Sequence, residues 1–377
     1  MPLDHPASPL AARLAARIRA DGPFSVAAYM EACLTDSEHG YYATRQPMGR
    51  GGDFVTAPEI SQIFGELIGI WVIATWQALG QPEEITVAEL GPGRGTLLHD
   101  ALRSWRNFPD FRRSVRLALV ERSDTLKAIQ ADTLAAEIEQ APPVPASWHE
   151  SLQTLPPSPL IVIANEFLDA LPIRQFVRRG HAWHERLVTC AEDGTLAFAE
   201  SPDPAGDIPQ LARFENKAHD GDIAEIRPGA ADLVAALAAR GESGPLAALF
   251  VDYGPEGFGP GDTLQAVRGH GFADPLEAPG EADITAHVDF SAITGQAIRE
   301  GLSAYGPMPQ GEFLLKLGLA QRQEQLLRSA TPDQRPMLAT GANRLIDPQQ
   351  MGVLFKAFAL TGRGVPPPPP FSTGSEA

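Results

Sequence analysis

The chain has 377 residues, of which 44% are hydrophobic and 20% charged, and this length allows two or three domain-sized units or one α/β domain with insertions. Its formal net charge of -17 argues against duplex nucleic acid as a partner, which requires basic side chains that neutralise phosphates. The negative charge suits a cationic ligand or a basic peptide, although solubility alone would also explain it. No run of about 18 apolar residues occurs, so we expect no membrane-spanning helix.

The first 80 residues are predicted to form a helical segment and a lid. Leu10, Leu14 and Ile18 recur at helical spacing, and Ser25 is suited to cap a second helix over residues 26–34. The N-terminus lacks the apolar core of a secretory signal. It faintly resembles an arginine-bearing transit peptide, but we favour an ordinary surface helix.

A stretch rich in glycine, aromatic residues and acids follows at residues 40–60. It contains Tyr41-Tyr42 and two acids, Asp53 and Glu59. The aromatic rings either pack in a core or form a lid whose ring faces meet a cationic ligand, and composition favours packing. A helix is predicted over residues 58–80, because apolar residues line one of its faces.

Residues 85–96 carry a ligand-binding signal. An apolar, β-branched run that ends in Glu89-Leu90 predicts a strand, and Gly91, Gly93 and Gly95 follow before a predicted helix. Glycines let the backbone approach a ligand closely, and the start of the helix presents free N–H groups. A tight β–α turn that binds nothing is the alternative interpretation.

A second acid favours ligand binding. Glu121 follows a strand predicted at residues 115–120, where a carboxylate can accept hydrogen bonds from a ribose diol. Dinucleotide enzymes and S-adenosylmethionine (SAM) methyltransferases share this device, so other residues must decide between them. Ser123 then caps a predicted helix, and a short third strand is predicted at residues 147–152, which include Glu150-Ser151.

A strongly apolar strand predicted at residues 160–164 leads into Asn165, Glu166 and Asp169. Ligands of open α/β sheets bind outside the carboxyl ends of the strands, so two acids and an amide at this point form a candidate site. Helix capping by Asn165 or Asp169 is the alternative. Residues 81–172 would then form the first half of an α/β core.

The remainder of the chain is predicted in three parts. Residues 173–245 break the α/β pattern and are predicted to be an inserted β and irregular subdomain. Residues 246–360 are predicted to be the second half of the core and to complete a sheet of seven strands, with a helix near residues 313–327 and a strand near residues 353–360. The Pro-rich residues 361–377 are predicted to be a disordered or extended tail.

Several motifs occur together in one order: Gly40-Tyr41-Tyr42, Gly52 to Ser61, Glu89 to Thr96, Asn165 to Pro172, Asp252-Tyr253-Gly254, Gly261 to Gln265, Asp283 to Phe290 and Met351 to Lys356. With these motifs the chain resembles the MidA family of class I SAM-dependent methyltransferases over residues 23–360. That family includes the mitochondrial arginine methyltransferase that assists assembly of respiratory complex I. Leu168 departs from the family pattern, which has a second aromatic residue there, but an apolar replacement should not abolish function.

The resemblance implies an α/β fold, a class I (Rossmann-like) methyltransferase sheet of seven strands with a helical N-terminal segment and an insertion. It also implies SAM as the cofactor. By resemblance, the methionine part of SAM is held by Glu89, Gly91, Gly93 and Gly95, the ribose by Glu121, and the adenine by Glu150 and Ser151, with Asn165 as a further cofactor-binding candidate.

The reaction implied is an in-line methyl transfer from a sulfonium to a nitrogen, for which donor and acceptor must be aligned. An arginine guanidinium is planar and always protonated, so two carboxylates can hold it and localise its charge until one nitrogen becomes nucleophilic. Glu166 and Asp169 are the first candidates for these carboxylates, and Asp53 and Glu59 of the lid are the second.

Three functional hypotheses stay open. The first is a protein arginine methyltransferase that acts on a subunit of a respiratory complex. The second is a methyltransferase for a small molecule or another side chain. The third is a non-catalytic assembly factor that binds its client. An NAD-dependent dehydrogenase is disfavoured, because Thr96 stands where a dinucleotide fingerprint has its third glycine.

The expected partner is a protein client, such as a complex I subunit, with neither nucleic acid nor membrane insertion; a homodimer stays open. Cys33 and Cys190 lack metal-ligand spacing, so we expect no metal site and a reducing compartment. The expected location is the bacterial cytoplasm, or the mitochondrial matrix if the protein is eukaryotic.

Overall fold

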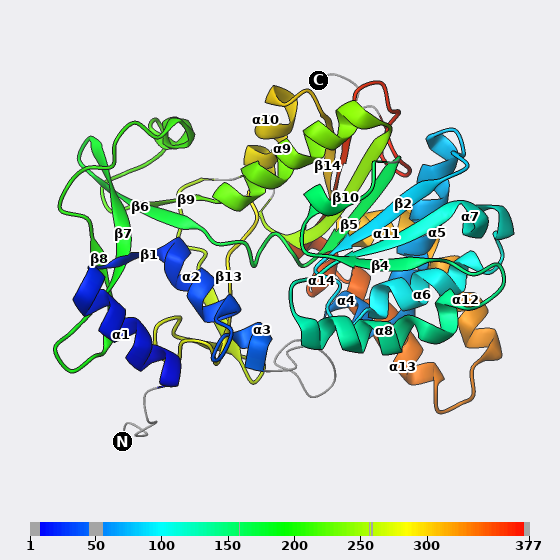
Figure 1. Cartoon of the computed structure of the whole chain (residues 1–377), viewed down its shortest axis with the longest axis horizontal. Helices are drawn as coiled ribbons and strands as arrows, with labels where there is room; N and C mark the ends of the chain where they lie inside the picture. Colours follow the sequence, from blue (N-terminus) through cyan, green and yellow to red (C-terminus); the bar gives the residue numbers. More distant parts are fainter. Residues whose placement is uncertain (1–7, 45–55, 158, 256, 258, 373–377) are drawn as a thin grey trace. The chain divides into compact units, whose positions relative to one another are not determined.

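The computed structural model describes residues 8–44, 56–157, 159–255, 257 and 259–372 (Figure 1). The chain divides into two compact units, each made of three chain segments. The first unit contains Met1–Phe54, Asp169–Ala231 and Gly257–His287. The second unit contains Val55–Leu168, Asp232–Glu256 and Val288–Ala377.

The second unit is built around a sheet of seven strands. Their order is β14 (Ser303–Pro309), β15 (Phe355–Thr361), β10 (Leu246–Tyr253), β5 (Leu160–Asn165), β2 (Ile85–Leu90), β3 (Val115–Val120) and β4 (Ala146–His149). The strands from β10 to β4 run parallel, whereas β15 is antiparallel to both β10 and β14. The seven-stranded α/β fold predicted from the sequence is confirmed.

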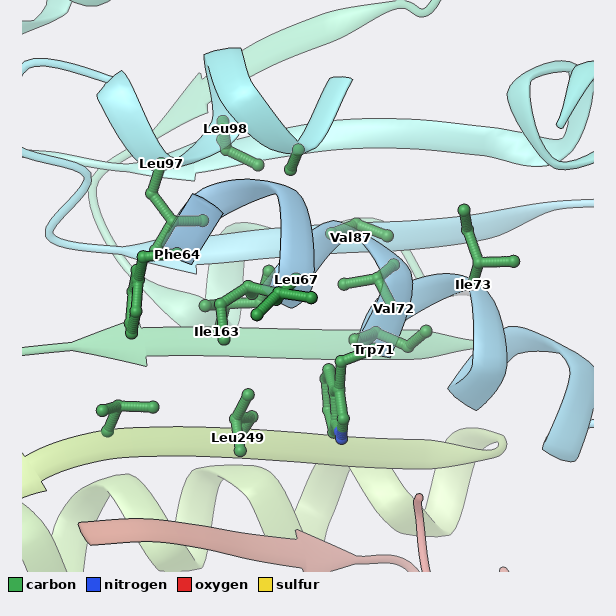
Figure 2. Close-up of a cluster of buried hydrophobic side chains, with 14 of the residues drawn as sticks. Phe64, Leu67, Trp71, Val72, Ile73, Val87, Leu97, Leu98, Ile163 and Leu249 are labelled. Carbon is green, nitrogen blue, oxygen red and sulfur yellow. The ribbon is translucent and has the colours of Figure 1, made fainter. Parts of the chain in front are cut away.

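The central strands are apolar because both faces of the sheet are covered. All residues of β2 and β10 are buried. In Figure 2, α5 (Gln62–Ala78) projects Leu67 and Trp71 into a cluster that also holds Val87 of β2, Ile163 of β5 and Leu249 of β10. The helix predicted over residues 58–80 is divided at Ser61 into α4 (Ala57–Ile60) and α5, and α5 covers one face of the sheet.

Two glycines bring α5 close to α6 (Thr96–Trp105). A Cβ atom built on Gly69 would lie 2.8 Å from the Cα of Ala101, and one built on Gly65 would lie 2.8 Å from the carbonyl oxygen of Leu97. Real Cβ atoms do not approach backbone this closely, so the packing requires glycine at both positions. Because α6 begins at the glycine loop, this contact also anchors the loop.

The second unit contains further helices: α4 (Ala57–Ile60), α7 (Pro109–Ser114), α8 (Asp124–Ile138), η1 (Leu152–Thr154), α10 (Phe290–Arg299), α11 (Gln310–Lys316), α12 (Leu319–Ser329), α13 (Arg335–Ile346) and α14 (Met351–Leu354). The predicted cap of α8 is confirmed, since Ser123 Oγ accepts from the N–H of Leu126 at 3.3 Å. In the described part of the chain, no helix combines the length and the apolar character that a membrane crossing requires.

The first unit contains α1 (Pro9–Asp21), α2 (Val26–Thr35), α3 (Tyr41–Thr44) and η2 (Pro209–Phe214), together with two sheets. The N-cap predicted at Ser25 is confirmed, because its Oγ accepts from the N–H of Ala28 at 3.1 Å. One sheet has the order β1 (Phe24–Ser25), β7 (Ala182–Cys190), β6 (Arg174–Arg179) and β9 (Ile223–Ile226), with β8 (Leu196–Glu200) paired to β7; the other has the order β12 (Gly271–Ala273), β11 (Gln265–Arg268) and β13 (Asp283–Thr285).

The stretch predicted as an insertion, residues 173–245, contains the expected strands but also an unexpected helix. Strands β6 and β7 cover the two alternating runs that predicted a meander. The prediction of irregular structure to residue 245 is wrong at its end, because α9 (Pro228–Ser243) is a regular helix of 16 residues. Pro228 and Gly229 at its start resemble loop residues, although proline is well tolerated in a first helical turn.

The Pro-rich tail is packed as far as the structure describes it. Phe371 is 7% exposed and belongs to the core of the second unit, with its ring centroid 5.7 Å from that of Phe313. The disorder predicted for residues 361–377 is therefore wrong for the described part of this segment. Five successive prolines prevent a helix, but they do not prevent the chain from ending in a buried anchor.

Candidate functional site

The glycine loop joins β2 to α6 at the carboxyl edge of the sheet. Gly91, Gly93 and Gly95 have φ values of 61°, 55° and 82°, in the left-handed region that favours glycine. A Cβ atom at Gly91 would lie 3.0 Å from a ring atom of Phe167. No side chain caps the start of α6, so this end of the helix presents N–H groups suited to a negatively charged group.

Glu89 of β2 is a buried acid with an unsatisfied oxygen atom. It is 3% exposed, and its Oε2 atom has no hydrogen-bond partner among the described residues. Burial raises the pKa of its carboxyl to about 8. An unsatisfied buried carboxyl is costly, so the site is suited to a cationic group that donates hydrogen bonds.

Asn165 presents a second unsatisfied atom at the end of the neighbouring strand. Its Oδ1 atom is buried and has no partner among the described residues, and β5 pairs directly with β2, which carries Glu89. The amide Nδ2 donates to Oε1 of Glu166 at 3.2 Å. SAM fits these two unsatisfied acceptor oxygens, because its ammonium group can donate the missing hydrogen bonds and supply positive charge.

Glu121 follows β3 and its carboxylate is held at several points. Oε1 accepts from the N–H groups of Arg122 and Ser123, each at 2.8 Å, and Oε2 accepts from Nε2 of Gln130 at 3.2 Å. The side chain is therefore oriented before any ligand arrives, as expected for an acid that binds a diol.

The two residues predicted near the adenine lie beside the Glu121 strand. Glu150 and Ser151 directly follow β4, which pairs with β3, and the N–H of Glu121 donates to the carbonyl of His149 at 2.9 Å. Glu150 is exposed and Ser151 is half-buried. Their roles stay predictions.

Glu166 occupies a strained position directly after β5. Its φ is 49°, a value that costs a residue other than glycine about 1–3 kcal/mol. Its Oε1 accepts from the N–H of Ala57 at 3.1 Å as well as from Asn165. Strain of this kind is maintained where it positions a functional side chain.

Asp252, at the end of β10, holds the turn that follows Glu166. It is 1% exposed, and its Oδ2 accepts from the N–H groups of Phe167 and Leu168 at 3.2 and 2.8 Å. From the sequence, Asp252 was included only in one motif of the family resemblance, and its role in the site was not predicted. The rule that found Glu121, an acid directly after a buried strand, would also have found it.

The remaining candidate carboxylates have different surroundings. Glu59 of α4 accepts a hydrogen bond of 2.6 Å from the hydroxyl of Thr96, so the residue that replaces a third glycine ties α4 to the start of α6. Asp169 belongs to the first unit, where its Oδ1 accepts from the N–H of Ala170. In the same unit, burial and then the carboxylates of Asp283 and Asp169 raise the pKa of Tyr42. Asp53 lies outside the described residues.

The second unit thus brings most of the predicted side chains to one edge of one sheet, namely Glu59, Glu89, Glu121, Glu150, Ser151, Asn165, Glu166 and the three loop glycines. It also contains Gln130, a fully buried residue of α8 that the sequence did not single out. A glutamine within a helix belongs to no motif, so no signal could have found it.

Comparisons with known proteins give matches to methyltransferases. Residues 67–308 match a family described as S-adenosyl-L-methionine-dependent methyltransferases. The chain is 37% identical to the protein arginine methyltransferase NDUFAF7, mitochondrial, of Danio rerio, covering 92% of this chain and 85% of that protein. It is 36% identical to the protein of the same name from Homo sapiens, covering 95% and 85%.

A solved structure is similar over nearly the whole chain. It is a protein from Burkholderia thailandensis bound to S-adenosyl-homocysteine, 30% identical, with a TM-score of 0.80 and coverage of 95% of this chain and 92% of that chain. S-adenosyl-homocysteine is what SAM becomes when it gives up its methyl group.

Proposed function

This chain belongs to the MidA-like family of SAM-dependent methyltransferases, and from that premise we propose that it methylates arginine side chains of a protein client. SAM is its cofactor. The observation that carries the choice of arginine is the similarity to protein arginine methyltransferases, at 37% identity over 92% of this chain.

SAM supplies a methyl group on a positively charged sulfonium. In our proposal the ammonium and carboxylate of its methionine part are held by Glu89 and by the backbone of Gly91, Gly93 and Gly95. Glu121 binds the ribose diol. We assign the adenine to Glu150 and Ser151. The unsatisfied amide oxygen of Asn165 accepts a hydrogen bond from a donor on the cofactor.

Glu166 is our candidate for the carboxylate that receives the acceptor guanidinium. Its backbone strain and its hydrogen bonds from Ala57 and Asn165 support a fixed orientation beside the cofactor-binding residues. A carboxylate held in this way can accept guanidinium N–H groups and localise the positive charge away from the attacking nitrogen. Asp169, Asp53 and Glu59 stay as further candidates.

The proposal also names a class of client and a compartment. The family that the chain resembles includes a mitochondrial arginine methyltransferase that assists assembly of respiratory complex I, and the relatives carry the word mitochondrial in their names. We therefore propose a subunit of respiratory complex I or a similar complex as the client. In a bacterium this places the reaction in the cytoplasm, and in a eukaryote in the mitochondrial matrix. The competing functions are methylation of another acceptor and client binding without catalysis. Incubation with labelled SAM distinguishes both from arginine methylation.

The first test is calorimetric titration with SAM and with NAD. We expect micromolar binding of SAM, no binding of NAD, and loss of SAM binding in Gly93→Val, because a β-branched side chain is strained at a φ of 55°. The protein is then incubated with labelled SAM and a lysate of its own source, and methylated residues are identified by mass spectrometry.

The second test compares Glu166→Gln with Glu139→Gln, a matched change at an exposed position. We expect Glu166→Gln to lower kcat about 100-fold or more and to change SAM affinity little, with no effect of Glu139→Gln. Normal arginine methylation in Glu166→Gln would refute the role of that carboxylate. Labelled lysine, or no labelled protein at all, would refute arginine as the acceptor.

A further inference from the structure

Gln130 connects three chain segments that carry or adjoin the proposed SAM-binding residues. Its side chain is 0% exposed and projects from α8. Nε2 donates to the carbonyl oxygen of Gly93 at 2.8 Å and to Oε2 of Glu121 at 3.2 Å. Oε1 accepts from the indole Nε1 of Trp148 in β4 at 2.9 Å.

The orientation of this amide is determined by its neighbours. An indole N–H can only donate, whereas a carbonyl and a carboxylate can only accept. Oε1 must therefore face Trp148, and the amide nitrogen must face Gly93 and Glu121. Both N–H groups and the oxygen are then used, so the residue is fully satisfied in a position where an unpaired amide would be costly.

Each contact meets a different part of the site. Gly93 belongs to the loop assigned to the methionine part of SAM, Glu121 is assigned to the ribose, and Trp148 precedes Glu150 and Ser151, which are assigned to the adenine. An ordinary core position on α8 would be filled better by an apolar side chain, as Leu126 and Leu134 are on the same helix.

We propose that Gln130 is a positioning residue for SAM, which holds the glycine loop, the ribose acid and the adenine strand in the binding arrangement before the cofactor arrives. The proposal rests on the function proposed above and names no contact between Gln130 and SAM. Pre-organisation of this kind increases affinity, because the cost of ordering the loops is met during folding.

The test uses Gln130→Met, which keeps the length of the side chain but removes all three hydrogen bonds. We expect the Kd and KM for SAM to rise about 10- to 100-fold, because three polar groups lose their partner and the loops lose their tie. kcat at saturating SAM should stay within about twofold, since no reacting group changes. Gln140→Met, an exposed glutamine after α8, is the matched control.

Gln130→Glu supplies a readout that a purely structural role would not move. The introduced carboxyl would be buried beside Glu121, and both burial and the like charge would raise its pKa. Only its protonated form can donate to Glu121, so the SAM affinity of this variant, measured relative to wild type at the same pH, should recover as the pH falls from about 9 to about 6. Gln130→Met should show no such recovery.

The outcomes separate the two proposals. Failure of the wild-type protein to bind SAM overturns the proposed function and this inference with it. If the wild type binds SAM and Gln130→Met binds it within about twofold of wild type, the inference alone is overturned. An equal loss of SAM affinity in Gln130→Met and Gln130→Glu at every pH, parallel to a loss of thermal stability, also overturns it, because Gln130 would then act only in folding.

Discussion

The proposed contact of Glu89 with the ammonium of SAM predicts that protonation of this carboxyl is coupled to cofactor binding. Its pKa of about 8 in the structure is caused by burial, and no described residue offers its Oε2 a hydrogen bond. A bound ammonium would favour the ionised carboxylate and lower that pKa. We therefore predict that SAM affinity rises as the pH increases from about 6 to about 8.5, and that binding near pH 7 releases a proton.

The measurement is calorimetric titration of SAM at several pH values in buffers of different ionisation enthalpy, which gives both the affinity and the number of protons released on binding. In Glu89→Gln the pH dependence should disappear and the affinity should fall at all pH values. A pH dependence that persists in Glu89→Gln would show that another group is responsible.

The same residue predicts an opposite effect on stability. Because the folded-state pKa lies above the unfolded value of 4.5, the contribution of Glu89 to stability is fully present below pH 4.5 and is lost as the pH rises through about 8. Glu89→Gln should therefore raise the melting temperature of the ligand-free protein near pH 8, as read by a thermal scan against wild type. A lower melting temperature at that pH would contradict the buried, unpaired carboxyl.

At the scale of single residues, the sequence predicted those site residues that lie at or just after the end of an apolar strand. Acids and glycines directly after apolar strands predicted Glu89, Gly91, Gly93, Gly95, Glu121 and Glu166, and the structure brings them to one edge of a sheet. Gln130 could not be predicted, because its partners come from β2, β3 and β4 through tertiary packing. The left-handed backbone of Glu166 was equally hidden, since glutamate rarely adopts it.

At the scale of helices, the contact of α5 with α6 is a point of low tolerance. We predict that Gly69→Ala lowers the free energy of unfolding by about 1–3 kcal/mol, because the new methyl group would meet the backbone of Ala101 and force the helices apart. Since α6 begins at the glycine loop, SAM affinity should fall with it. Chemical denaturation and SAM titration measure the two effects.

Gly206→Ala is the control for that substitution. Gly206 is exposed, and a Cβ atom built there meets nothing within 4 Å, so stability should be unchanged or slightly raised. A Gly69→Ala variant as stable as Gly206→Ala would mean that α5 and α6 can separate at no cost.

Element prediction succeeded where periodicity and end signals agreed and failed where they conflicted. The strand predicted at residues 115–120 coincides with β3. The helix predicted near residues 313–327 is two helices, α11 and α12, because Gly318 has a φ of 98°. The strand predicted from residue 353 begins later, since residues 351–354 form α14, and α13 was not predicted at all. α13 has a weak apolar stripe, and its place is determined by the burial of its own Ala342 and Leu345 in the core of the second unit.

At the scale of the whole molecule, the net charge of -17 predicts how a basic client would associate. We expect kcat/KM for an arginine-bearing protein client to fall several-fold between about 50 mM and about 300 mM salt, because salt screens the attraction between an acidic surface and a cationic partner. SAM affinity serves as the internal control and should change little. A kcat/KM that is insensitive to salt would mean that the acidic surface does not guide the client.

The position of β15 in the sheet has a consequence for protein synthesis. This strand, Phe355–Thr361, lies between β10 and β14, and β14 pairs with no other strand among the described residues. While the ribosome is still translating the preceding codons, β10 presents an unpaired edge and β14 has nothing to join. A nascent chain released too early would keep that edge open, and open edges pair with other chains. A chain that stops before β15 would therefore leave the sheet incomplete, since only a chain translated beyond this strand closes it.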